Sequence, residues 1–259
     1  MNSLLYKNPA MLIAAVLFVL MILFNRLGFF IRQKQVKKTS GIMEGLGPVE
    51  GSLLGLLALL LSFTFSMSAA KNDTRRGVIV EEANDISTAI LRCDLYPDSV
   101  RKILRPVFDS YVDARIDYYN AGIDTAKLNS SLQRTNEYST RIWKRVMYLS
   151  QDKENTLRSQ QMIPALNAMM DIVTTREAER IAHVPESILL LLFILTLAGS
   201  FIIGYGSSAK RFNWIVSFGF ALMTAMTIYL ILDLDRPRRG LINMDSTQAK
   251  IIDLKDMLE

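Results

Sequence analysis

Four long stretches of the sequence contain no charged residue, and this feature limits what the chain can fold into more than any other. They cover residues 8–25, 51–70, 187–209 and 212–232. Each is close to the ~20 residues that a helix needs to cross a hydrocarbon core of ~30 Å. A bilayer core offers the backbone no water, so such segments satisfy their hydrogen bonds as helices. The sequence therefore predicts a multi-pass membrane protein with four transmembrane helices.

The first stretch is the shortest and has two interpretations. A cleaved signal peptide is one of them. However, apolar residues continue past Asn25 and Arg26 as far as Ile31, and no small-residue cleavage site follows. We therefore predict a retained helix with a bent or interfacial end.

A polar insertion, residues 71–186, separates the second stretch from the third, and its apolar residues follow a helical period. One helix face repeats at spacings of three and four, through Val100, Ile103, Leu104, Val107, Tyr111 and Ala114. Pro97 favours a helix start there, and Pro106 predicts a kink or a break. A turn is expected at residues 120–122, a helix at 128–147, and a third helix from near Asn155 or Pro164 to His183.

No alternating strand pattern of useful length occurs, so the predicted fold class is all-α. We expect four transmembrane helices with a helical extramembrane domain inserted between the second and the third. The predicted organisation is residues 1–70 for the first two spans, 71–186 for the helical domain, 187–234 for the last two spans, and 235–259 for a C-terminal tail.

The composition excludes several functional classes. The net charge of +5 and the pI of 9.3 come from lysines and arginines beside the spans, so they do not imply nucleic acid. A single cysteine, Cys93, and a single histidine, His183, exclude an internal disulfide and the usual zinc sites. We find no phosphate loop, metal motif or nucleophile elbow, so we predict neither an enzyme nor a cofactor. Cys93 is expected in the core, and His183 is expected to be a satisfied or exposed side chain.

No span contains an ionisable residue. Ion-coupled carriers usually hold such groups at membrane depth, so a coupled transporter is disfavoured, whereas a passive pore is not. The distribution of lysine and arginine between the short loops and the other side is nearly balanced, and it leaves the sidedness of the insertion open.

The second span carries a stripe of small residues at spacings of three and four: Gly51, Gly55, Ala58, Ser62, Ser66 and Ala69. Such a stripe permits close packing of helices, which is the simpler interpretation. The alternative is that this span surrounds a central pore and that the stripe seats it against neighbouring helices.

Large apolar residues of the same span supply a candidate pore constriction. Leu57, Leu61 and Phe65 repeat at a spacing of four and would gate by dewetting. Phe63 and Met67 form an alternative constriction that fits the spacing equally well.

Charged residues follow this span immediately. The candidate pore-mouth charges are Arg75, Arg76, Glu81, Glu82, Asp85 and Arg92. They are consistent with a salt-bridge lattice between helices or subunits, with an anion-attracting ring of arginines, or with snorkelling to lipid headgroups.

Several of these segments resemble the bacterial bestrophin-like domain family. The resemblance is carried by residues 51–67, by Arg75-Arg76, and by Glu82-Ala83-Asn84. It is extended by residues 111–115, Tyr-Val-Asp-Ala-Arg, and by residues 232–237 with Gly240. Asn72 departs from the family pattern, in which an aromatic residue is common.

The resemblance to bestrophins implies a pentameric channel in the bacterial plasma membrane that passes small anions such as chloride. Its pore would be formed by the second helices, and a helical vestibule would lie in the cytoplasm. The alternative hypothesis is a non-conducting, membrane-anchored structural or sensory module whose helical domain binds a ligand or partner.

Overall fold

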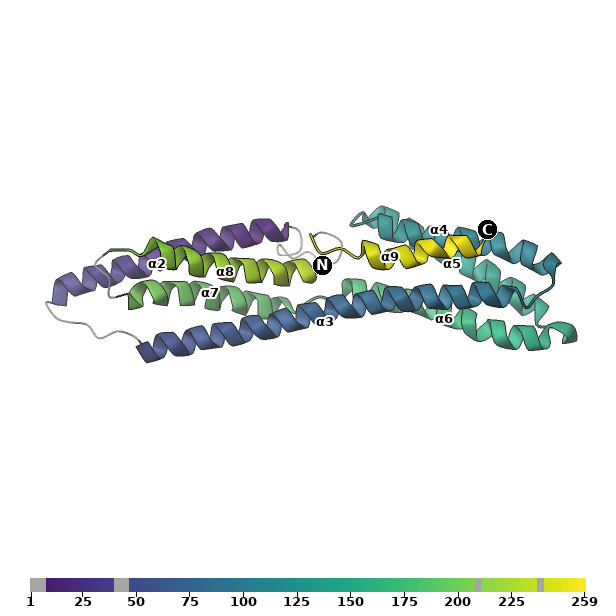
Figure 1. Ribbon diagram of the computed structural model, residues 1–259, viewed down its shortest axis with the longest axis horizontal. Helices are drawn as coiled ribbons and strands as arrows, with labels where there is room; N and C mark the ends of the chain where they lie inside the picture. Colours follow the sequence, from purple (N-terminus) through teal and green to yellow (C-terminus); the bar gives the residue numbers. More distant parts are fainter. Residues whose placement is uncertain (1–7, 40–46, 208–210, 237–239) are drawn as a thin grey trace. The chain divides into compact units, whose positions relative to one another are not determined.

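The computed structural model describes residues 8–39, 47–207, 211–236 and 240–259, and these residues form helices and no strands (Figure 1). The all-α prediction is confirmed. Four helical segments, which include α2, α3, α7 and α8, are long and apolar enough to cross a membrane. The helices are α2 (Ala10–Thr39), α3 (Gly47–Cys93), α4 (Asp98–Asn120), α5 (Thr125–Leu149), α6 (Thr156–Ile181), α7 (Glu186–Gly206), α8 (Trp214–Leu234) and α9 (Asp245–Ile252), with 3-10 turns at Lys153–Asn155 and Asp253–Met257.

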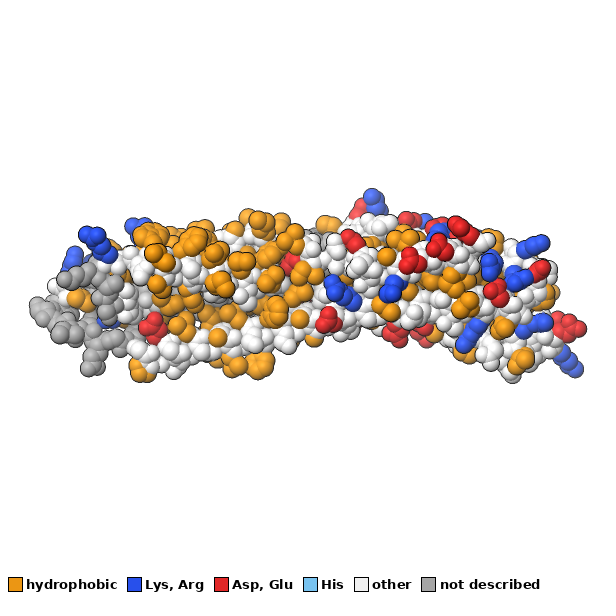
Figure 2. Space-filling view, in the orientation of Figure 1, with side chains coloured by type: hydrophobic (Ala, Val, Ile, Leu, Met, Phe, Trp, Pro, Cys, Tyr) orange, Lys and Arg blue, Asp and Glu red, His pale blue; other side chains and the backbone are white. Residues whose placement is uncertain are grey.

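The chain divides into two compact units. Unit 1 comprises Met1–Lys71 and His183–Arg236, and it contains α2, the first half of α3, α7 and α8. In it, α2 lies against both α7 and α8, and Met21, Leu192 and Ile228 are fully buried. Figure 2 shows hydrophobic side chains over the surface of this unit as well. Helices that are apolar on the inside and the outside are typical of membrane spans.

Two glycines of unit 1 bring α2 and α7 into backbone contact. A Cβ atom added at Gly204 would lie 1.9 Å from the carbonyl oxygen of Asn25, and one at Gly28 would lie 2.1 Å from that of Phe201. Because the obstacle is backbone, no side-chain movement relieves it. Glycine is therefore required at both positions for this helix pair to form.

We expect Gly204→Ala to lower the stability of unit 1 by about 1–3 kcal/mol, the usual cost of overpacking. Gly219→Ala on α8 is the control, because a Cβ atom there meets nothing within 4 Å. Thermal unfolding of the purified protein in detergent measures both variants. Equal melting temperatures for the two would contradict the close approach.

Unit 2 comprises Asn72–Ala182 and Pro237–Glu259. In it, α4 packs against α5 and α9, and α5 packs against α6. Its core contains Ile86, Leu104, Phe108, Ile142 and Leu166, none of them more than 1% exposed. Figure 2 shows most of the acidic and basic side chains on this unit.

The predicted turn between α4 and α5 is confirmed. Gly122 adopts a φ of +56°, a left-handed conformation that glycine accepts without strain. Asp124 then caps α5, because its side chain accepts hydrogen bonds from the N–H groups of Ala126 and Lys127.

Of the kink or break predicted at Pro106, the break is wrong, because α4 runs through this residue as one helix. Pro106 and Lys102 both lie on the exposed side of α4. The carbonyl of Lys102, which loses its usual N–H donor, therefore faces solvent rather than the core. Pro164 is likewise accommodated inside α6.

The structure also describes the two ends of the chain. The helix that contains the N-terminal span continues past Asn25 without interruption, as α2, to Thr39. The C-terminal tail, which the sequence predicts only as a separate segment, belongs to unit 2 from Pro237 onward. Its residues Ile251 and Leu254 are buried in the core of that unit, and the ammonium group of Lys255 lies 2.5 Å from Asp109 and 2.7 Å from Asp113.

Candidate functional site

The inward face of α3 is set by residues that recur every three or four positions. In unit 1 it carries Leu57, Thr64 and Ser68, all buried. In unit 2 the same spacing continues through Arg75, Ile79, Glu82 and Ile86, which are also buried. Residues at this spacing share one side of a helix, so α3 has a single face turned toward its own chain.

The opposite side of α3 is exposed, and we name it the outward face. Its members are Gly51, Gly55, Leu59, Ser62, Phe63, Ser66, Ala70, Asp73 and Gly77. Cβ atoms added at Gly51, Gly55 or Gly77 would meet nothing within 4 Å. The described residues of the chain therefore leave this face uncovered.

The predicted small-residue stripe lies mainly on and beside the outward face. Gly51, Gly55, Ala58, Ser62 and Ser66 are exposed, whereas Ala69 is half-buried. Packing of this stripe against another helix therefore requires a helix from a second copy or a different protein, and it stays a prediction.

The first predicted constriction is not compatible with the position of Leu57. This residue is 2% exposed and packs in the core of unit 1 beside Gly199, so it faces its own chain. Leu61 is half-buried, and Phe65 is exposed. In the alternative set, both members are exposed: Phe63 at 61% and Met67 at 38%.

The predicted pore-mouth charges separate into two groups. Arg75 and Glu82 are buried, and their side chains make contacts inside unit 2. The Nε and Nη2 atoms of Arg75 donate to the carbonyl oxygens of Glu179 (3.0 Å) and Ala182 (2.5 Å), which lie at the C-terminal end of α6. Arg76 and Glu81 are exposed, and Asp85 and Arg92 are half-buried, with Arg92 donating to the carbonyl of Gln161.

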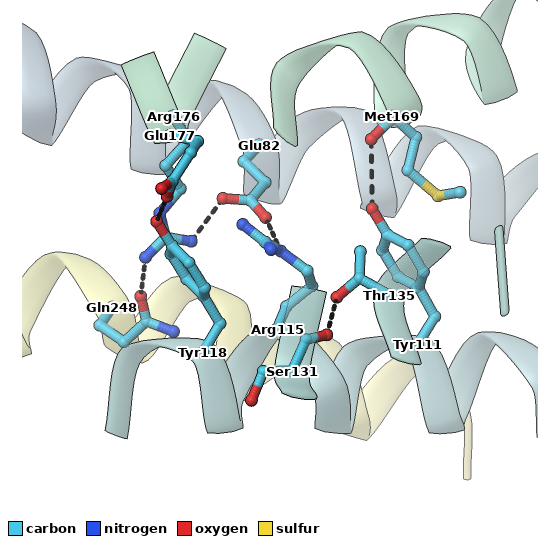
Figure 3. Close-up of polar contacts among 10 residues, drawn as sticks. All are labelled: Glu82, Tyr111, Arg115, Tyr118, Ser131, Thr135, Met169, Arg176, Glu177 and Gln248. Atoms are coloured by element: carbon cyan, nitrogen blue, oxygen red, sulfur yellow. Dashed lines mark hydrogen bonds and ion pairs between the residues drawn. The ribbon is translucent and has the colours of Figure 1, made fainter. Parts of the chain in front are cut away.

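Glu82 is the centre of a buried polar network in unit 2 (Figure 3). Each of its two carboxylate oxygens accepts a hydrogen bond from a different guanidinium, one from Arg115 on α4 and one from Arg176 on α6. Arg176 also donates to the side-chain oxygen of Gln248 on α9, at 2.8 Å. One carboxylate thus joins α3, α4 and α6, and Arg176 extends the network to α9.

The ring of Tyr118 lies close to both guanidinium groups. Its centroid is 4.5 Å from the Cζ atom of Arg115 and 5.3 Å from that of Arg176. Its hydroxyl group donates to Glu177 at 2.5 Å, and Glu177 is also paired with Arg180. An aromatic face attracts cations, so Tyr118 compensates part of the positive charge.

The network holds two guanidinium groups around the single carboxylate of Glu82, so positive charge is in excess at its centre. Burial alone would raise the pKa of Glu82, but the charges and hydrogen bonds of Arg115 and Arg176 outweigh burial and hold it below its ordinary value of 4.5. Burial also disfavours the charged form of Arg115, whereas Glu82 more than compensates and raises its pKa. The Nη1 and Nη2 atoms of Arg115 have no hydrogen-bond partner among the described residues. The positive charges of Arg115 and Arg176 therefore favour the ionised form of Glu82.

His183 is held by a contact with the backbone, and Cys93 lies in a hydrophobic core. The Nδ1 atom of His183 lies 3.0 Å from the carbonyl oxygen of Asp235, whose carboxylate accepts from the N–H of Val184 at 2.9 Å. Cys93 is fully buried in the core of unit 2. Within the described part of the chain, no group of three or more His, Cys, Asp or Glu residues is arranged to hold a metal ion.

Arg115, Arg176 and Asp73 were not among the site residues predicted from the sequence. A signal for the first two existed, because Arg115 shares the predicted apolar face of α4 with Tyr111, and a charged residue on such a face needs a buried partner. Asp73 gave no signal before the inward face of α3 was known.

These observations define an all-helical, multi-pass membrane protein with a helical unit inserted between its second and third spans. The model of the Bestrophin-like domain matches residues 11–248, and the chain belongs to this family. No curated protein matches it.

Solved structures with the same fold come from Klebsiella pneumoniae. A bacterial bestrophin homologue aligns with a TM-score of 0.71 and 14% identity, over 94% of this chain and 98% of that one. A single-substitution variant of that homologue aligns with a TM-score of 0.75 and 14% identity, over 97% of each chain. Identity at this level supports the fold alone.

Proposed function

We propose that the chain forms an oligomeric ion channel whose path is lined by the outward faces of α3 from several copies. Membership of the Bestrophin-like family and the fold of the bacterial bestrophin homologues support this kind of function. As a multi-pass protein it would act in the bacterial plasma membrane. The pentameric state implied by the resemblance is part of the same proposal.

One observation carries the proposal. Apart from Leu59 and Phe63, the outward face of α3 within residues 51–70 bears only small residues, where a helix that faces lipid would bear large apolar side chains. Gly51, Gly55, Ser62 and Ser66 are exposed inside a segment without charge. Small residues let helix backbones approach one another, and hydroxyl groups tolerate a wet lumen. A face of this kind fits the inside of an assembly.

Phe63 is the best candidate for the constriction. It lies on the outward face, and it is more exposed than any other large apolar residue in residues 51–70. Rings of apolar side chains close a pore by dewetting it. Met67, one turn further along α3, would extend the same constriction.

The sign of the permeant ion follows from the charges that remain exposed on α3 in unit 2. The prediction of anions from the residues depended on Arg75 and Arg76, but Arg75 is buried. Asp73, Arg76 and Glu81 are exposed there, so two of the three charges are acidic. Rings of Asp and Glu attract cations, and we therefore propose that this mouth favours cations over the anions that the resemblance implies.

Reconstitution in planar bilayers tests the proposal. We expect ion currents from the purified protein and a larger single-channel conductance from Phe63→Ala, because the truncation widens and wets the constriction. Leu190→Ala is the matched control, since Leu190 is equally apolar, is exposed and lies on α7. A sealed protein that is monomeric or dimeric in detergent would instead support the non-conducting anchor module.

A further inference from the structure

Arg76, Glu81 and Asp85 are among the charged side chains of α3 that have no ion pair with any described residue. Several other charged residues of unit 2 are paired, for example Arg134 with Asp117 at 2.7 Å and Arg105 with Asp94 at 3.1 Å. Arg76, Glu81 and Asp85 have no such partner among the described residues, and they lie on one helix beside its uncovered face.

The three residues lie on opposite flanks of that face. A helix turns about 100° per residue, so Glu81 is about 140° and Asp85 about 180° around the axis from Arg76. Gly77, Val80 and Asn84 lie between the two flanks. One flank is thus basic and the other acidic.

No described cation forms an ion pair with Glu81 or Asp85 on the acidic flank. Burial and the neighbouring carboxylates Glu81 and Glu82 raise the pKa of Asp85 above its ordinary value. Glu82 is engaged by Arg115 and Arg176, and Arg92, at the next turns of the same flank, donates to the carbonyl of Gln161. A positive charge from outside the chain would relieve this crowding.

We propose that the basic flank of one copy docks against the acidic flank of the next, so that Arg76 pairs with Glu81 across the subunit boundary and brings a positive charge toward Asp85. This inference rests on the proposed function, because it requires a ring of copies around α3. In a ring the contacts are head-to-tail, so each copy presents one flank to one neighbour and the other flank to the next. Opposite charges on opposite flanks match this arrangement.

Arg76 and Glu81 also lie close enough along the axis of α3 to pair between neighbouring copies. Arg76 and Glu81 differ by five residues, about 7.5 Å along the helix. Both side chains are long, so the guanidinium and carboxylate groups can approach each other across this offset. A Cβ atom at Gly77 would meet nothing within 4 Å, so this region of α3 is open to a close neighbour.

Thiol cross-linking tests the geometry. In a Cys93→Ser background, which removes the only native thiol, the double variant Arg76→Cys/Glu81→Cys is treated with a short bismaleimide in detergent. We expect a ladder of linked subunits up to the full assembly, and no ladder from either single variant. Linked dimers from Arg76→Cys alone would overturn the head-to-tail arrangement, as would an intact oligomer without links in the double variant.

Charge reversal tests the energetics. Arg76→Glu is expected to lower the oligomeric fraction severalfold at low salt, and Arg76→Glu/Glu81→Arg is expected to restore it. Lys144→Glu, an exposed change of the same kind on α5, is the control. Native mass spectrometry measures each fraction. If the wild type is monomeric, both the proposed function and this interface fail; if it is oligomeric but Arg76→Glu behaves like the control, the interface alone fails.

Discussion

Replacement of Glu82 by alanine is expected to destabilise unit 2 by about 3–5 kcal/mol, the cost of removing one partner from a buried ion pair. The side chains of Glu82 and Arg115 are fully buried, and that of Arg176 is 6% exposed. Without the carboxylate, two guanidinium groups would remain in the core with Tyr118 as their main compensation. Among the described residues of unit 2, no other carboxylate is the shared counter-ion of two buried guanidinium groups.

Tryptophan fluorescence during denaturant unfolding in detergent measures this loss. The chain has two tryptophans, Trp143 against the core of unit 2 and Trp214 in unit 1. A Trp214→Phe background therefore isolates the signal of unit 2. Glu154→Ala, at an exposed position, is the control, and an equal shift in the two variants would contradict the role of the network.

The apolar replacement Glu82→Leu/Arg115→Met/Arg176→Met separates charge from packing. Removal of all three charges avoids the unpaired guanidinium groups, so this variant should recover much of the stability that Glu82→Ala loses. If the triple variant is as unstable as Glu82→Ala, the network contributes shape rather than charge compensation.

The lowered pKa of Glu82 gives the same network a pH dependence. Its folded-state pKa lies below the ordinary value of 4.5, so its stabilisation is fully present above pH 4.5. The stabilisation is lost as the pH falls through the lower folded-state value. Acid unfolding of Glu82→Gln should therefore depend less on pH in this window than that of the wild type.

The second large effect is expected at Asp73. Asp73→Lys changes the charge of each subunit by two units on the outward face, and we expect it to shift selectivity from cations toward anions. At about 10 Å in water, each unit charge contributes on the order of 0.4 kcal/mol. Two unit charges in each of several subunits sum to about 2–4 kcal/mol before salt screening, so we expect the permeability ratio to change by more than tenfold.

Reversal potentials across a salt gradient measure this ratio. Low ionic strength is preferable, because salt screens exposed charges. Asp171→Lys on α6 makes the same change of charge at another exposed position and is the control. Asp73→Asn should give an intermediate ratio. Identical reversal potentials for wild type and Asp73→Lys would remove Asp73 from the ion path.

The spans and helices of this fold follow closely from local sequence signals. Stretches without charge place the membrane helices, and Gly122 and Asp124 mark the α4–α5 turn. The behaviour of Pro106 was not predictable from its own identity, because a proline inside a helix is tolerated when the carbonyl that it frees faces water. The docking of α9 depends on long-range contacts of Ile251 and Leu254, which no local pattern reports.

The candidate site was predictable in location but only partly in its residues. Arg75 and Arg76 look equivalent in the sequence, yet one is buried and the other is exposed. Their difference follows from the spacing of Arg75, Ile79, Glu82 and Ile86, which places Arg75 on the apolar side of α3. The same period places Leu57 inward and Phe63 outward, so the helical phase of α3 carries more information than the identity of any one residue.

The packing of α9 into unit 2 has a consequence for membrane topology. Because α9 shares a core with α4, residues 72–182 and 240–259 occupy the same side of the bilayer, and the chain crosses an even number of times between them. The two spans that lie between them, α7 and α8, are an even number of crossings. A reporter enzyme fused after Glu259 therefore reports the compartment of the whole inserted unit, and one fusion fixes the sidedness of every loop.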